Sequence, residues 1–229
     1  TLGLLSTCSV LPDKSADTAG SVNAEPSISP NFILVLVDDL GWSSLSSSMD
    51  KARPDAKSDY YQTPNIDSIV QQGMRFSNPY AASPVCSPTR YSIQFGKSPA
   101  RLGRTRVLGP NNVDHNQTAI PQVLKSINPE YVAAHFGKWH IDAEPSRYGY
   151  DVHDGRTTNR EGGFDNDRKR QWLGYAETDP KRIYSIIDRA IAFIRNTIDQ
   201  ERPFFLQLSH YAVHSNIVYS EAAYDETSQ

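Results

Sequence analysis

The side chains that could bind a metal or act as acids, bases or nucleophiles fall into a few short groups. They are Asp38 with Asp39, Cys86 with Arg90, Lys138 with His140, and His210 with His214. All but the cysteine group directly follow an apolar run that is typical of a strand. In open α/β sheets, ligands bind beyond the carboxyl ends of the strands. We therefore expect these groups to converge on one crevice.

The aspartate pair follows the apolar run from Phe32 to Val37. Burying unpaired carboxylates costs several kcal/mol, so a cation is expected to meet them. Ligation by oxygen alone favours Ca²⁺ or Mg²⁺ over zinc. The alternative is that one aspartate caps the next turn while its neighbour faces water.

Cys86 lies at the expected start of a short helix. Ser87 is suited to cap this helix, Pro88 to occupy its first position and Gly96 to end it. The positive end of the helix and Arg90, one turn along, would favour a nucleophile or an anion-binding group at Cys86. A buried structural thiol is the plainer alternative. The sixth residue after Cys86 is a serine, so the C-x5-R pattern of cysteine phosphatases is absent.

Strand-like and helix-like segments alternate along the chain, which predicts an α/β fold. Strand-like runs cover residues 32–37, 74–82, 131–140 and 203–214, and helices are expected over 64–72, 88–95, 118–127 and 180–198. The first run is expected to be buried on both faces of a largely parallel sheet. The last helix has Asp179 as its cap and Pro180 at its first position. Its apolar stripe, expected to face the core, is Ile183, Ile186, Ile187, Ala190, Ile191, Ile194 and Ile198.

The composition is that of a globular chain, with 229 residues, 38% of them hydrophobic, and a formal net charge of -3. Mixed charges of this kind create no field that would attract nucleic acid. Cys8 and Cys86 are the only cysteines, which is too few for a disulfide framework or a thiolate zinc site. A disulfide between the two is the remaining alternative. No run approaches the roughly 20 apolar residues of a membrane span.

The first residues, TLGLLSTCS, resemble the end of a signal peptide. Leu5 to Cys8 is similar to the bacterial lipoprotein box, which would place a lipid on Cys8. Residues 1–30 are expected to form a solvated tether, and residues 31–229 a folded domain. The chain is therefore expected to be exported, either as a periplasmic or outer-membrane lipoprotein or as a secreted protein.

Three sequence blocks resemble the sulfatase family. Cys86-Ser87-Pro88-Thr89-Arg90, followed by YSIQFGK, is similar to the C-x-P-x-R signature, FGKWH to a second block, and NFILVLVDDLGW to the opening strand. Phe95-Gly96-Lys97 departs from the usual T-G-R, and no proline follows His214 at the usual place. The resemblance implies an α/β, alkaline-phosphatase-like fold, with a largely parallel or mixed central sheet flanked by helices. Residues 31–229 would be the amino-terminal part of its catalytic domain, truncated at the carboxyl end.

The resemblance also implies a mechanism. Cys86 would be oxidised to formylglycine by the formylglycine-generating enzyme, and the aldehyde would be hydrated. One hydroxyl would attack sulfur and displace the alcohol, and the second would then expel the sulfate, which restores the aldehyde. Asp38, Asp39 and the modified Cys86 would ligate a divalent metal, with Ca²⁺ expected and Mg²⁺ as the alternative.

Basic residues would bind the hydrate and the sulfate and transfer a proton. Arg90 would hold the hydrate, and Lys138 would bind both the hydrate and a sulfate oxygen. His140 would take a proton from the second hydroxyl, and His214 would contact the sulfate. The implied function is hydrolysis of sulfate esters, with sulfated polysaccharide as a candidate substrate. A phosphate or phosphonate monoester hydrolase and a non-catalytic anion- or glycan-binding fragment are the alternatives.

Overall fold

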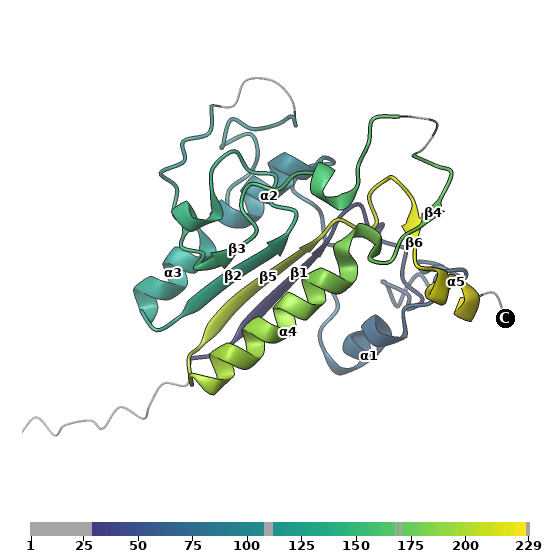
Figure 1. Ribbon diagram of the computed structural model, residues 1–229, viewed down its shortest axis with the longest axis horizontal. Helices are drawn as coiled ribbons and strands as arrows, with labels where there is room; N and C mark the ends of the chain where they lie inside the picture. Colours follow the sequence, from purple (N-terminus) through teal and green to yellow (C-terminus); the bar gives the residue numbers. More distant parts are fainter. Residues whose placement is uncertain (1–28, 108–111, 168, 170, 228–229) are drawn as a thin grey trace, which may run out of the picture.

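The computed structural model describes residues 29–107, 112–167, 169 and 171–227, so the expected tether with Cys8 lies almost entirely outside the described residues. Its centre is a parallel sheet with the strand order β1-β5-β2-β3 (Figure 1). The strands are β1 Phe32–Val37, β2 Val132–Gly137, β3 Val152–His153 and β5 Phe204–His210. The predicted α/β fold with a largely parallel sheet is confirmed.

Because the strands of this sheet are parallel, their carboxyl ends open on one edge. β5 lies between β1 and β2, with Val37 paired to His210 and Gly137 paired to Ser209. The residues that follow β1 and β2 are thereby brought to the two sides of the end of β5. The predicted gathering of polar groups at this edge follows from that register.

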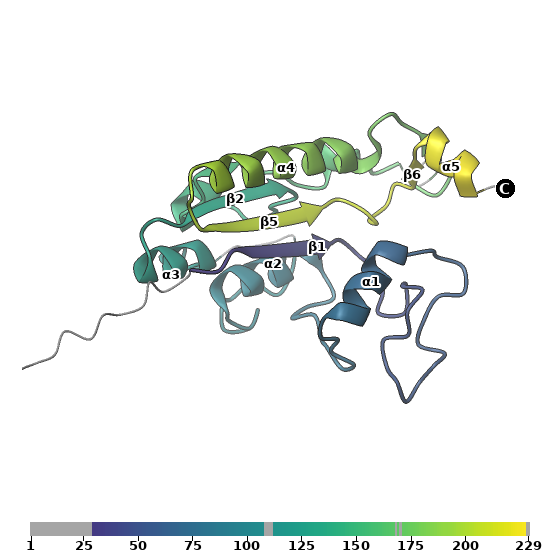
Figure 2. The ribbon, with the colours of Figure 1, turned by 90° about the horizontal axis from the view of Figure 1, so that it is seen from below.

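Helices cover both faces of the sheet (Figure 2). The described helices are α1 Pro64–Gln72, α2 Cys86–Phe95, α3 Ile120–Ile127, α4 Ile183–Asp199 and α5 Glu221–Thr227, of which α5 lies beyond the strand ends beside β6. On one face α4 packs through Ile186, Ala190 and Phe193. On the other face α2 and α3 surround a core that contains Tyr91 and Trp139. None of the described helices is long and apolar enough to cross a membrane.

Short elements complete the described chain. They are the 3₁₀ turns Pro145–Tyr148, Arg160–Gly162 and Pro180–Arg182, and the paired strands β4 Tyr175–Ala176 and β6 Val218–Tyr219.

β1 differs from its prediction. It pairs with β5 alone and forms one edge of the described sheet, where Ile33 and Val35 are each 53% exposed. The prediction of burial on both faces is wrong, because an apolar run indicates a strand but not how many layers cover it. The run predicted over 74–82 also forms no strand. Phe76 is 68% and Tyr80 90% exposed, and no described strand pairs with this segment.

The start of α4 is also later than predicted. In the short turn Pro180–Arg182, both Lys181 and Arg182 have a φ of 55°, which no right-handed helix allows, so the α-helix begins only at Ile183. The N-cap of α4 is therefore Arg182, and the prediction that Asp179 is the cap is wrong. The Oδ1 of Asp179 still accepts a hydrogen bond from the backbone N–H of Tyr184, in the first turn of α4, at 2.8 Å.

The buried stripe of α4 is narrower than predicted. Its buried members are Ile186, Ala190, Phe193 and Thr197. Ile191 and Ile198, predicted to face the core, are 41% and 56% exposed. A single helix on a short sheet buries one narrow stripe, so isoleucines beside that stripe face solvent.

α2 begins earlier than predicted. Cys86 is its first residue and Val85 its N-cap, while the buried Ser87 hydroxyl has no partner among the described residues. Pro88 is tolerated inside the first turn, where its missing N–H would have no helical acceptor. Gly96 ends the helix in the left-handed conformation, with a φ of 61°, as predicted. Cys86 therefore lies within the first turn, at its positive end.

Candidate active site

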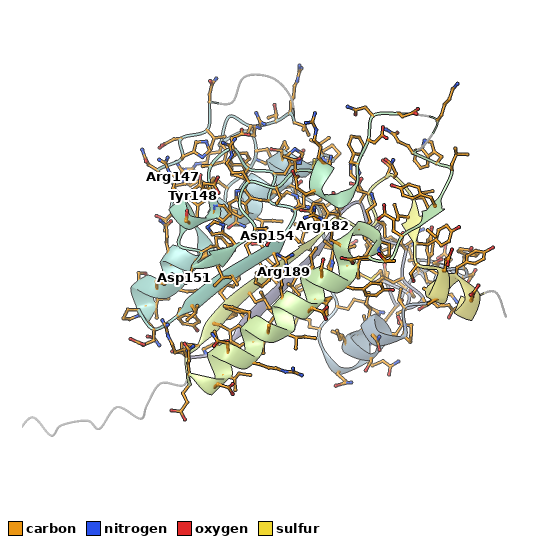
Figure 3. All side chains as sticks on the ribbon, in the orientation of Figure 1. Arg147, Tyr148, Asp151, Asp154, Arg182 and Arg189 are labelled. Atoms are coloured by element: carbon orange, nitrogen blue, oxygen red, sulfur yellow. The ribbon has the colours of Figure 1, made fainter. Side chains whose placement is uncertain are left out.

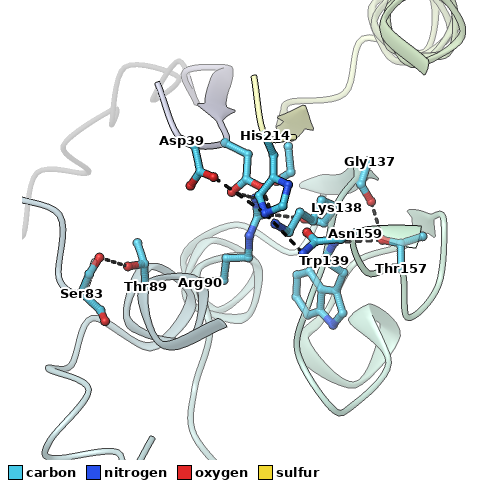
Figure 4. A network of polar contacts seen from close by, with 12 residues as sticks. Asp39, Ser83, Thr89, Arg90, Gly137, Lys138, Trp139, Thr157, Asn159 and His214 are labelled. Carbon is cyan, nitrogen blue, oxygen red and sulfur yellow. Dashed lines mark hydrogen bonds and ion pairs between the residues drawn. The ribbon is translucent and has the colours of Figure 1, made fainter. Parts of the chain in front are cut away.

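Asp38 is the centre of the polar cluster at the carboxyl edge of the sheet. Its Oδ1 accepts a hydrogen bond from Arg90 at 3.1 Å, and its Oδ2 accepts one from Lys138. Arg90 also donates to the backbone carbonyl of Lys138, so its guanidinium bridges the ends of β1 and β2 (Figure 4). All three side chains are buried, with exposed fractions of 6% for Asp38, 3% for Arg90 and 0% for Lys138. Their predicted convergence is observed.

The charges of this cluster favour an ionised carboxylate. Burial alone would raise the pKa of Asp38, but the charges of Arg90 and Lys138 outweigh it and hold the pKa below its usual value. Two cations share this one buried acid. The cluster therefore carries excess positive charge, which suits an anionic ligand.

Lys138 follows a close approach of β2 to β5. Gly137 has a φ of 96°, and a Cβ at this position would lie 2.1 Å from the carbonyl oxygen of Ser209. Only glycine fits such a position without moving the backbone. The backbone N–H of Lys138 donates to the same Ser209 carbonyl at 2.7 Å. The Lys138 side chain therefore leaves the sheet from a fixed point beside Asp38.

Thr157, which sequence reasoning did not identify, holds the rest of this segment. The backbone N–H groups of Trp139 and His140 donate to its hydroxyl and its carbonyl, each at 2.8 Å. Its hydroxyl in turn donates to the Gly137 carbonyl (Figure 4). A lone threonine in a loop gives no sequence signal for such a role, because the segment from Gly137 to His140 must first be brought to it.

His140 is a neutral imidazole at pH 7. Burial, together with the charges of Lys138 and Arg90, lowers the pKa of His140 to about 4. Its Nδ1 is buried and has no partner among the described residues. The ring is thus unprotonated at pH 7 and has a free nitrogen that can accept a hydrogen bond or a proton, as a weaker base than an exposed histidine.

Cys86 is a free thiol and partly exposed. It lines a pocket of about 340 Å³ together with Asp38, Asp39, Thr89 and Arg90. This pocket lies between the end of β1 and the amino-terminal turn of α2, where backbone N–H groups favour anions. The predicted nucleophile and both predicted acids thus border one space.

His214 reaches the site from the loop that follows β5. Its Nε2 lies 3.7 Å from Asp39 Oδ2 and 3.5 Å from the side-chain nitrogen of Asn159 (Figure 4). The loop is held by a hydrogen bond from Asp38 N–H to the Ala212 carbonyl at 2.8 Å. His210, the other histidine of this group, has a buried Nδ1 without a partner in the described part of the chain.

The predicted metal ligands suit a divalent cation in chemistry but not in number. Asp38 and Asp39 supply carboxylate oxygens, which hard cations prefer. Across the described ranges, no group of at least three His, Cys, Asp or Glu side chains is placed to hold a metal ion. Both oxygens of Asp38 already accept hydrogen bonds from Arg90 and Lys138. These donors fall short of the roughly six to eight oxygens that Ca²⁺ takes.

The family comparison agrees with this geometry. The Sulfatase family model matches residues 30–229, so the chain belongs to the sulfatase family, as its sequence blocks predicted. It is 28% identical to N-acetylgalactosamine-6-sulfatase of Sus scrofa, over 87% of this chain and 42% of that protein. It is 32% identical to arylsulfatase G of Homo sapiens, over 55% of this chain and 23% of that protein. The chain spans less than half the length of these relatives.

Solved structures share the fold. Ps i-CgsB in complex with k-i-k-neocarrahexaose superposes with a TM-score of 0.58 at 23% identity, covering 81% of this chain and 46% of that chain. A protein in complex with its substrate D-glucosamine-2-N,6-O-disulfate superposes with a TM-score of 0.56 at 25% identity, covering 81% of this chain and 35% of that chain. The predicted alkaline-phosphatase-like class of fold is confirmed.

Proposed function

We propose that this chain forms the nucleophile-bearing part of a sulfuric ester hydrolase. The observation that carries the proposal is the pocket that Cys86 shares with Asp38, Asp39 and Arg90. Membership of the sulfatase family supports the reaction class. The excess positive charge around Asp38 supports an anionic substrate.

In this proposal Cys86 is converted by the formylglycine-generating enzyme to formylglycine, whose hydrate supplies the attacking hydroxyl. Arg90 and Lys138 are both held by Asp38, so their positive charges are oriented before the substrate arrives. Fixed charges of this kind stabilise negative charge that develops on a reacting group. Lys138 therefore binds a sulfate oxygen, and Arg90 holds the hydrate. The neutral His140 accepts a proton, and His214 contacts the sulfate.

The test of the nucleophile is the chemical state of Cys86 in protein from its native host. Trypsin releases this residue in the peptide from Phe76 to Arg90, which contains no internal lysine or arginine. We expect mass spectrometry to show the side chain as an aldehyde, without sulfur, and a hydrazide reagent to label it. A C86S variant serves as the unlabelled control. A peptide that carries only the thiol would contradict this mechanism.

We further propose that Asp38 and Asp39 would supply part of a Ca²⁺ site, with Mg²⁺ as the alternative, which needs oxygen ligands beyond those that the described residues provide. When bound, such an ion would supply Lewis acidity for the reaction. We expect D39N to weaken Ca²⁺ binding by at least about tenfold in calorimetric titration, because one charged ligand is lost. D59N, at a carboxylate that is 89% exposed, is the matched control and should leave Ca²⁺ binding unchanged. Equal affinities of D39N and the unsubstituted chain would remove Asp39 from the metal site.

The substrate class that we propose is a sulfated sugar, including sulfated polysaccharide. One relative is named N-acetylgalactosamine-6-sulfatase, and one structural neighbour has D-glucosamine-2-N,6-O-disulfate as its substrate. Initial rates on matched aryl sulfate and aryl phosphate esters, followed by 6-sulfated hexosamines, test this proposal. We expect the sulfate ester to be cleaved faster. A faster phosphate ester would favour a phosphomonoesterase instead.

We also propose, from the sequence alone, that the protein is exported and carries a lipid on Cys8. Fractionation of the native host should then find it with membranes, and C8S should release it.

A further inference from the structure

Gln94 is a buried polar residue of α2 that the proposed mechanism does not use. Cys86, Arg90 and Gln94 follow one another at intervals of four residues, so they lie along one stripe of the helix. The first two belong to the candidate active site, whereas Gln94 lies in the second half of the helix and is 2% exposed. A buried amide is costly unless it is hydrogen bonded, so the partners of Gln94 are informative.

These partners form a small buried network. Gln94 Nε2 donates to Gln207 Oε1 of β5 at 2.7 Å. The Tyr150 hydroxyl donates to the two amide oxygens, at 3.0 Å to Gln94 Oε1 and at 2.7 Å to Gln207 Oε1. Gln207 is 2% exposed and Tyr150 3%. We call these three side chains the amide network.

The amide network extends to the strand that delivers Lys138. Gln207 Nε2 donates to Ser209 Oγ at 3.1 Å, and the same oxygen shares a hydrogen bond of 3.1 Å with Nε2 of His135 in β2. The backbone carbonyl of Ser209 accepts from the backbone N–H of Lys138 at 2.7 Å. A continuous chain of hydrogen bonds and strand pairing thus joins the helix of Cys86 to the segment of Lys138.

α2 is therefore attached to the sheet at two depths. Arg90 binds Asp38 and the Lys138 carbonyl at the carboxyl edge, and Gln94, about 6 Å further along the helix, binds the middle of β5. Two attachments on one stripe set both the rotation of the helix and its position along its axis. A rotation by one residue, roughly 100°, would withdraw Gln94 and leave buried amide groups unpaired.

α4, on the other face of the sheet, is attached differently. It packs through the apolar side chains Ile186, Ala190 and Phe193. Its Arg189 pairs with Asp154, as labelled in Figure 3, but the Arg189 side chain is 42% exposed. Apolar contacts are not directional, whereas buried hydrogen bonds tolerate one arrangement. The directional attachment belongs to the helix that carries Cys86.

We propose that Gln94 is a positioning residue, which fixes the first turn of α2 so that Cys86 faces Asp38 and Lys138. It acts through the helix and touches neither substrate nor the reacting atoms. This inference rests on the proposed function, for which it names the residue that places the nucleophile.

The rate at which iodoacetamide alkylates the unmodified Cys86 tests this proposal without turnover. Mass spectrometry of the tryptic peptide from Phe76 to Arg90 measures that rate, which can be followed in the folded chain because Cys86 is partly exposed. We expect Q94M, which keeps a side chain of similar length but no hydrogen bonds, to raise the rate by about threefold or more, because α2 is then free to move. Q207M removes the same hydrogen bond from β5 and should act alike.

I186V is the matched control, because it disturbs the packing of α4 but leaves no polar group unpaired. It should lower the urea midpoint of unfolding and leave the alkylation rate unchanged.

The triple variant Q94M/Y150F/Q207M separates positioning from stability. It makes the whole amide network apolar, so its urea midpoint should return most of the way to that of the unsubstituted chain. Its alkylation rate should stay raised, because the directional attachment is still missing.

Recovery of both quantities in the triple variant would overturn the positioning role, and so would unchanged alkylation rates in folded Q94M and Q207M. Either result would leave the proposed hydrolase intact. If native Cys86 carries only the thiol while the variants alkylate as expected, the positioning role stands and the formylglycine mechanism fails.

Discussion

His135 and His140 show how burial sets the chemistry of single residues near this site. His135 lies inside β2, is fully buried and shares a hydrogen bond of 3.1 Å with the Ser209 hydroxyl. Burial, together with the charge of Arg90, lowers the pKa of His135 to about 3. For His140 burial and the charge of Lys138 lower the pKa to about 4. Both rings are therefore neutral in the folded chain at pH values where an unfolded chain would protonate them.

We predict that the folded state loses stability as the pH falls from about 6.5 towards 3. The unfolded chain binds more protons in this window, so stability present above it is lost progressively as the pH falls. For His135 alone the loss is roughly 4–5 kcal/mol across the window. Urea unfolding between pH 7.5 and 4.5 measures it, and H135Q should flatten the curve. A free energy of unfolding that stays constant down to pH 4.5 would contradict this account.

At the scale of secondary structure, the contact between β2 and β5 places the segment from Gly137 to His140. Gly137 is needed there for two reasons, since its φ is positive and the Ser209 carbonyl occupies the space of a Cβ. The sequence block FGKWH indicates that a glycine precedes the lysine, but the steric reason appears only in the paired strands. Gly96 offers a contrast, because its φ is also positive, at 61°, while nothing lies within 4 Å of a Cβ there.

We predict that G137A destabilises the chain by roughly 3 kcal/mol or more, because backbone atoms of β5 would have to move. G96A should cost only about 1 kcal/mol, from strain at a positive φ without a clash. Chemical denaturation of both variants compares them directly. Similar losses for the two would show that β2 and β5 approach each other less closely than described.

The elements that end at the site were predictable because apolar runs mark strands and parallel strands end together. Asp38 and Lys138 illustrate this success. The pairing of Arg90 with Asp38 was not predictable, since it depends on how α2 packs below the sheet. The burial of Lys181 was not predicted, because a lysine in the first turn of an amphipathic helix normally faces solvent. The late start of α4 depends on the left-handed backbone angles of Lys181 and Arg182, and neither residue type predicts such angles.

At the scale of the whole molecule, the described sheet is covered unevenly. α4 packs over β2 and β5 and leaves one face of β1 open. Ile33 and Val35 alternate along that strand and point to this open face, whereas Leu34 packs against the core. An exposed apolar edge strand is a template for association between chains.

We predict that this chain self-associates as its concentration rises, and that the double substitution I33K/V35K suppresses the association. The free energy of unfolding should change by less than about 0.5 kcal/mol, because both side chains are half exposed. Sedimentation velocity over a concentration series measures the association. A matched pair of lysines on another exposed surface, I69K/M74K, should leave association unchanged. A monomeric unsubstituted chain at every concentration would contradict the prediction.

The central place of β5 has a consequence for synthesis on the ribosome. β5 is the last strand of the four-stranded sheet to be made, yet it pairs with both β1 and β2. At a translation rate of roughly 5–20 residues per second, on the order of ten seconds pass between synthesis of Cys86 and synthesis of β5, and the sheet cannot form before then. During this interval the thiol belongs to a nascent, unfolded segment. An enzyme that recognises the unfolded sequence around Cys86 could bind it during this interval, before the first turn of α2 packs against the sheet.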